Sequence, residues 1–170
     1  MQLDVRNVLS GIVDELPFEG LVELEDVQYL GNQIHFVGPV QVSGRVSNMG
    51  KGLELEAKAW GRLETLCARC GKPAQAVFSY PLEETIVKQS EATEEIPEEA
   101  ILLEGNVLDL HDMVLNGFYS VAETKYLCSK DCKGLCPHCG VDRNVAECNC
   151  SANETDPRLA VLDTLFDEIN

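Results

Sequence analysis

The chain has 170 residues, of which 45% are hydrophobic and 25% charged, and its formal net charge is −16. This hydrophobic content excludes a chain that is disordered throughout, and the length suits one domain of ordinary size with a small satellite. No apolar stretch approaches the ~20 residues of a membrane span, so a membrane protein is excluded, as are collagen and a coiled coil. The negative charge also excludes a simple polybasic nucleic-acid binder.

The first residues carry no recognisable targeting signal. The opening segment MQLDVRNVLSGIVDEL lacks a basic region, a long apolar region and a small-residue cleavage site. We therefore expect a cytoplasmic protein, whose thiols stay reduced. Apolar residues at helical spacing between Asp4 and Leu16 predict a short helix or an irregular arm that ends at Pro17.

From about Val27 the hydrophobic pattern changes to a period of two, which predicts an antiparallel sheet over about residues 27 to 88. The clearest strand runs from Leu53 to Glu64, with leucine and alanine on one face and charged side chains on the other, and it follows a turn around Gly50. A further strand is expected from Gln75 to Val87. Trp60 falls on the polar face, where it covers a sheet edge, contacts a partner or is an ordinary amphipathic surface residue.

Residues 83–104 are rich in glutamate and read as an acidic connector, either a solvated linker or a segment that docks on a basic partner. A helix is predicted from Asn106 to Val121, and another from Asp156 to Ile169. The predicted fold class is α+β, with an antiparallel β-sheet or hairpin core, a C-terminal helix and a zinc-ribbon-like cysteine module. We place the core domain at residues 1–122, including the connector, and a Cys-rich metal-binding tail with the terminal helix at residues 123–170.

Eight cysteines are grouped at short separations, which in a cytosolic protein is typical of metal ligands. They are Cys67, Cys70, Cys128, Cys132, Cys136, Cys139, Cys148 and Cys150. Two Cys-x-x-Cys-Gly segments, at Cys67 and at Cys136, predict metal-binding turns, here called knuckles. Eight thiolates suffice for two closed tetrahedral sites, which favours two structural zinc ions, although an iron–sulfur cluster uses the same ligands.

The sequence favours one grouping of these ligands but leaves a second open. In the favoured grouping, one site consists of Cys67, Cys70, Cys128 and Cys132, and the other of Cys136, Cys139, Cys148 and Cys150. In the alternative, the four cysteines from Cys128 to Cys139 form one site, and Cys67 and Cys70 join Cys148 and Cys150.

The charge pattern favours a basic protein as the partner, since a molecule of charge −16 repels phosphates. Several cations nevertheless lie beside the cysteines, where they contact RNA or a partner or merely offset the thiolate charge: Arg69, Lys72, Lys130, Lys133 and Arg143. We find no catalytic motif and no sign of a small-molecule substrate, so we expect no enzyme. The alternatives are a thiol redox protein or redox sensor that uses Cys67 and Cys70, and, third, a nuclease.

The cysteine motifs resemble those of the YceD family. Its pattern is matched by the pair Cys67-Ala-Arg69-Cys70, an acidic spacer and a tail that comprises Cys128, Cys132, Gly134, Leu135, Cys136, Pro137, Cys139, Gly140, Asn144, Cys148 and Cys150. The family is associated with accumulation of the large-subunit ribosomal RNA (23S rRNA), and its genes commonly lie beside that of a small basic ribosomal protein. The resemblance implies a role in synthesis, processing, stability or assembly involving this RNA. We therefore expect a non-enzymatic zinc-binding factor that binds a basic ribosomal protein or a large-subunit precursor.

Overall fold

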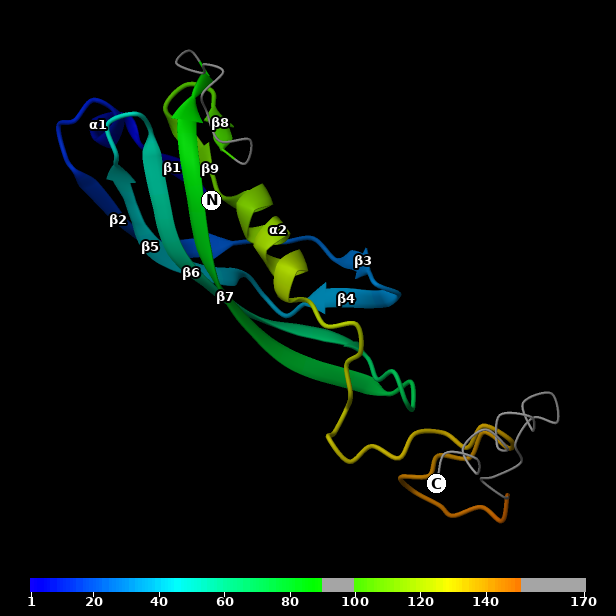
Figure 1. Cartoon of the computed structure of the whole chain (residues 1–170). Coiled ribbons are helices and arrows are strands. Elements are labelled where there is room, and N and C mark those ends of the chain that lie inside the picture. Colours follow the sequence, from blue (N-terminus) through cyan, green and yellow to red (C-terminus); the bar gives the residue numbers. More distant parts are fainter. Residues whose placement is uncertain (90–99, 151–170) are drawn as a thin grey trace, which may run out of the picture. The chain divides into compact units, whose positions relative to one another are not determined.

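The computed structural model describes residues 1–89 and 100–150 (Figure 1), and the chain divides into two compact units, Met1–Lys130 and Asp131–Asn170. All helices and strands of the described residues lie in the first unit. The predicted helix from Asp156 to Ile169 lies outside the described residues. Among the helices that are described, neither has the length and hydrophobicity needed to cross a bilayer.

A seven-stranded sheet forms most of the first unit (Figure 1). Its strands pair in the order β2-β5-β6-β4-β3, and β7 joins β6 to β8. All pairs are antiparallel except β7 with β8, which is parallel. The strands are β2 (Glu15–Val22), β3 (Val27–Tyr29), β4 (Asn32–Phe36), β5 (Val40–Asn48), β6 (Leu53–Leu66), β7 (Pro73–Lys88) and β8 (Ile101–Leu103).

The remaining elements are short, apart from one helix. Strand β1 (Gln2–Asp4) pairs antiparallel with β9 (Val107–Asp109), and α1 (Arg6–Leu9) is a single turn. Helix α2 (His111–Val121) follows β9 directly. The antiparallel sheet and the helix confirm the predicted α+β class in its broad outline.

The β6–β7 hairpin is the longest feature of the sheet, and alternate residues of β6 are buried. The first half of β6 pairs with β5 as far as Trp60, whereas Leu63 and Glu64 pair with β4. The pairing with β7 continues to the end, where Leu66 lies opposite Pro73. This long ladder fixes the position of the loop that carries Cys67 and Cys70.

Helix α2 packs against one face of the sheet through aromatic side chains (Figure 1). The ring of Phe118 lies 5.0 Å from the rings of both Phe36 and Phe78, edge to face in each case. The hydroxyl of Tyr80 donates a hydrogen bond to the Val114 carbonyl. Gly117 allows this close approach, because a Cβ at that position would overlap the Tyr80 ring.

The structure corrects three expectations about the chain's organisation. The predicted arm includes α1, but residues 15–22 form strand β2, in which Pro17 is tolerated because β2 lies at the sheet edge. The helix predicted from Asn106 starts at His111, whose N–H donates to Asp109 (3.0 Å), because Val107–Asp109 pairs with β1. The predicted connector is narrower than residues 83–104, since β7 extends to Lys88 and Ile101–Leu103 forms β8, while residues 90–99 lie outside the described residues.

Candidate metal centres

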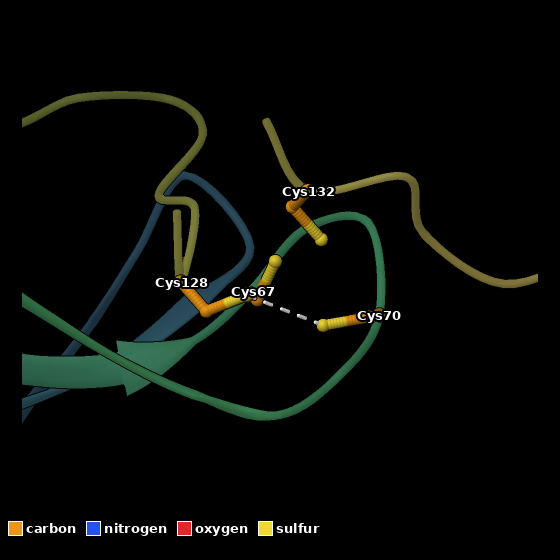
Figure 2. A group of neighbouring side chains, drawn as sticks. All are labelled: Cys67, Cys70, Cys128 and Cys132. Atoms are coloured by element: carbon orange, nitrogen blue, oxygen red, sulfur yellow. Dashed lines mark hydrogen bonds between the residues drawn. The ribbon is translucent and has the colours of Figure 1, made fainter. Parts of the chain in front are cut away.

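The eight cysteine sulfurs gather into two groups of four, and within each group all sulfurs lie within 4.8 Å of one another. The first tetrad consists of Cys67, Cys70, Cys128 and Cys132 (Figure 2). The second tetrad consists of Cys136, Cys139, Cys148 and Cys150. This is the grouping that the sequence favoured, and the alternative grouping is wrong. Each tetrad can therefore hold a metal ion.

The first knuckle is the turn between β6 and β7. The N–H of Cys67 donates to the Lys72 carbonyl (2.7 Å), and the N–H of Gly71 donates to the Cys67 carbonyl (2.9 Å). Gly71 has a φ of 70°, a conformation that side chains disfavour. The turn thereby brings Cys67 and Cys70 to the same side of the loop (Figure 2).

The second knuckle repeats this backbone geometry at a distant position in the sequence. The N–H of Cys136 donates to the Val141 carbonyl (2.8 Å), and the N–H of Gly140 donates to the Cys136 carbonyl (2.9 Å). Gly140 has a φ of 73°. Two loops with the same spacing thus adopt the same hydrogen-bonded turn, as the sequence predicted for a metal-binding segment.

The first cysteine of each knuckle is held in an environment that favours its thiolate. Burial opposes ionisation of Cys67, but hydrogen bonds from the backbone of Cys128, Arg69 and Cys70 outweigh it and lower its pKa to about 6. Backbone hydrogen bonds from Cys139 and His138 lower the pKa of Cys136 to about 6. Metals bind the thiolate form, so these amide groups favour metal binding.

The pKa of Cys150, the last cysteine of the second tetrad, shifts in the opposite direction. Hydrogen bonding to Cys139 raises the pKa of Cys150 to about 12, with burial and Cys136 adding to the effect. The raised pKa favours a neutral thiol at Cys150, which donates to the sulfurs of Cys139 and Cys136. A metal ion that binds all four sulfurs must displace this proton.

Cys128 is positioned by the segment that precedes it. The N–H of Ala68, within the first knuckle, donates to the Tyr126 carbonyl (2.9 Å), and the sulfurs of Cys70 and Cys128 lie 3.6 Å apart. Tyr126 is 6% exposed, and its hydroxyl accepts a hydrogen bond from the Glu123 N–H (3.1 Å). The sequence analysis missed Tyr126, and its place two residues before a ligand was the only available signal.

The cations predicted to contact RNA or a partner are all exposed: Arg69, Lys72, Lys130, Lys133 and Arg143. Arg69 and Lys72 lie in the first knuckle loop. Lys133 and Arg143 line a cavity of about 290 Å³ together with Glu147 and three cysteines of the second tetrad, Cys136, Cys148 and Cys150. Their role as contacts stays a prediction.

Comparison with known proteins decides the family. The family model described as "Large ribosomal RNA subunit accumulation protein YceD" matches residues 55–166, a segment that contains both tetrads. The chain belongs to the YceD family. The resemblance noted in the cysteine motifs is thereby confirmed.

Relatives of this YceD-family chain occur in Bacillus and Mycobacterium. It is 25% identical to the uncharacterized protein YlbN of Bacillus subtilis (strain 168) over 151 residues, covering 88% of this chain and 87% of that protein. It is 28% identical over 120 residues to an uncharacterized protein of Mycobacterium tuberculosis (strain H37Rv), covering 69% of this chain and 58% of that protein. No solved structure matches the chain.

Proposed function

We propose that this protein is a non-enzymatic, cytoplasmic zinc-binding factor for the accumulation of large-subunit ribosomal RNA (23S rRNA). The observation that carries the proposal is the family match over residues 55–166, because its description names this process. The proposed role covers the synthesis, processing or stability of this RNA, or assembly of the subunit.

The chemistry of the tetrads supports zinc as the metal. Four thiolates within 4.8 Å of one another suit the tetrahedral geometry and soft-ligand preference of Zn²⁺. Four thiolates also suit iron, so the metal's identity is a matter for elemental analysis of protein purified without oxygen. A stoichiometry of two zinc ions per chain would support the proposal, and iron in their place would contradict it.

The same chemistry supports a structural rather than a catalytic role. A catalytic zinc ion keeps one position for water or substrate, whereas four protein ligands close the coordination sphere. A closed site can hold segments of the chain in place but cannot activate a water molecule. The proposed factor therefore acts by binding.

Charge supports a basic partner, which we take to be a basic ribosomal protein or a large-subunit precursor. The chain carries −16, and a zinc ion with four thiolates adds two further negative charges for each tetrad. Such a molecule attracts lysine- and arginine-rich surfaces over several ångströms. Any direct RNA contact would then use exposed cations beside the cysteines, for which we propose Arg69, Lys72, Lys130, Lys133 and Arg143.

A depletion experiment tests the proposed function. Depleting the protein from cells should lower mature large-subunit RNA relative to small-subunit RNA, and a plasmid copy should restore the ratio. A copy carrying Cys67→Ser and Cys70→Ser should fail to restore it although the protein is present. An unchanged ratio after depletion would contradict the proposal.

A thiol redox function is the second candidate, and one observation favours it. The pKa of Cys67 lies near 6, below that of an ordinary thiol, and a thiolate is the reactive form. A redox protein would cycle between the dithiol and a disulfide of Cys67 with Cys70. Loss of function on changing Cys67 and Cys70, but not on changing Cys148 and Cys150, would favour this candidate.

A further inference from the structure

The sheet has a second face, opposite to α2, which we call the outer face. It is formed by the alternate residues of β2, β5, β6 and β7 that do not point into the core. One cross-strand row runs from Leu21 to Gln41, Trp60 and Ser79, since each of these residues pairs with the next. Trp60 therefore lies on a central strand, with β5 on one side and β7 on the other, and does not cover a sheet edge.

Large apolar side chains are exposed on this outer face. Trp60 is 40% exposed, Leu21 is 57% exposed and Val77 is 64% exposed. Val77 lies opposite Arg62, the next outward residue after Trp60. These side chains share one face of the sheet, and exposed apolar groups on the same face as a tryptophan are typical of a docking surface.

Carboxylates dominate the cross-strand rows of the outer face that contain Lys58, Glu56 and Glu54, on the opposite side of Trp60 from Arg62. The outward residues there include five glutamates and two cations: Glu15, Glu19, Glu54, Glu56 and Glu83, with Arg45 and Lys58. Arg45 forms an ion pair with Glu56 on the neighbouring strand. Glu56 also lies directly opposite Glu83 on β7. Like charges in opposing positions destabilise a sheet, and a cation from outside would relieve this repulsion.

Charge complementarity selects the occupant. A nucleic acid would meet a surface of its own sign, so its phosphates would be repelled. A lysine- or arginine-rich segment would instead bring cations to Glu54 and Glu83, and an arginine would be attracted to the exposed ring of Trp60. We propose that the outer face of the sheet, centred on Trp60 and the glutamates beside it, docks a lysine- and arginine-rich polypeptide. This inference rests on the proposed function and deepens it, because it names the surface that takes the basic partner.

The single tryptophan makes the proposal directly measurable, because the chain contains no other. The full-length, metal-loaded protein is titrated with a labelled arginine-rich peptide while peptide anisotropy and tryptophan emission are both recorded. Binding should shift the emission of Trp60 and protect it from quenching by iodide. Binding without any change in emission or quenching would overturn the proposal.

Matched charge variants provide the second measurement. Glu54→Gln with Glu83→Gln removes two charges from the outer face but leaves the Arg45–Glu56 ion pair intact. Glu25→Gln with Glu104→Gln removes the same charge from exposed positions outside the four strands. The first variant should weaken peptide binding about three- to tenfold, and the second less than about twofold. Equal weakening by both variants would show a response to net charge alone and would overturn the proposal.

Two further readouts separate the possible outcomes. A single-stranded RNA oligonucleotide should leave Trp60 emission unchanged, and RNA binding that alters it would overturn the choice of a polypeptide. In depleted cells, the wild-type copy tests the proposed function, and the Glu54→Gln, Glu83→Gln copy tests the outer face. Rescue by both copies would uphold the RNA role but overturn this inference, whereas rescue by neither, with both proteins present, would contradict the proposed function itself.

Discussion

The side-chain amide of Asn144 lies 3.5 Å from the sulfur of Cys132, so a residue between two ligands of the second tetrad donates to a ligand of the first. The Asn144 oxygen accepts a hydrogen bond from the Lys133 N–H (2.7 Å). The amide nitrogen also donates to Asp142 (2.7 Å). Asn144 is thus held in one orientation, and an N–H aimed at a thiolate stabilises its charge.

We expect Asn144→Ala to weaken metal binding at the first tetrad about tenfold, because residues that orient a metal ligand typically have effects of this size. Competition with a chromogenic chelator measures the affinity. Asn149→Ala is a suitable control, since Asn149 is exposed and lies between two ligands of the second tetrad. A loss confined to the second tetrad in Asn144→Ala would contradict the assignment.

The grouping of the ligands makes a second prediction. Changing Cys148 and Cys150 together to serine should halve the metal content, from two ions per chain to one, because both ligands belong to the second tetrad. Elemental analysis of anaerobically purified protein measures the number of metal ions per chain. The far-UV circular dichroism of the sheet should be unchanged, since all described strands lie within residues 2–109. Complete loss of metal would show that the two sites depend on each other.

The tetrads should also differ in how readily they lose metal. In the first tetrad Cys67, Cys70 and Cys132 are buried, whereas in the second only Cys136 is buried. A chelator and an alkylating agent should therefore reach the second tetrad first, and mass spectrometry should find Cys139 and Cys150 modified before Cys67 and Cys70. Rapid alkylation of Cys67 without a chelator would instead favour a redox role for that thiol.

The local features of the candidate site could be predicted from the sequence, because spacing determines them. Two cysteines followed by glycine produced the same turn at Cys67 and at Cys136, with the same pair of hydrogen bonds. Alternation of polar and apolar residues likewise identified β6 and β7.

Long-range contacts account for what the sequence did not predict. Strand β1 pairs with β9, and Gln2 lies opposite Asp109. Because these two strands lie at distant positions in the sequence, no local pattern in either strand identifies the other as its partner. This pairing removes Val107–Asp109 from the predicted helix. The contact of Asn144 with Cys132 likewise joins two residues that the second knuckle separates in the sequence, so no local pattern predicts it.

Gly117 provides a prediction about stability that runs against helix propensity. Alanine is about 1 kcal/mol better than glycine within a helix. At this position, however, a Cβ would overlap the Tyr80 ring and approach Leu82. Gly117→Ala should therefore destabilise the protein by about 1–3 kcal/mol, the usual cost of overpacking. Urea unfolding measures this. Asn116→Ala, on the exposed side of α2, should be neutral or stabilising, and a stabilised Gly117→Ala variant would contradict the packing described here.

Tyr80 predicts how stability changes in alkali. Burial raises the pKa of its hydroxyl well above the ordinary value near 10, because the charged phenolate is poorly solvated against α2. The unfolded chain therefore releases this proton at a lower pH than the folded chain. The contribution of Tyr80 is fully present below about pH 10, and stability falls as the pH rises further towards the folded pKa.

Tyr80→Phe should lower the free energy of unfolding at neutral pH by about 1 kcal/mol, since the hydrogen bond to Val114 is lost. Its stability should then decline less steeply above pH 10 than that of the wild type, although burial of Tyr126 leaves part of the slope. Urea unfolding at a series of alkaline pH values tests this, and identical slopes for the two proteins would show that Tyr80 does not carry the effect.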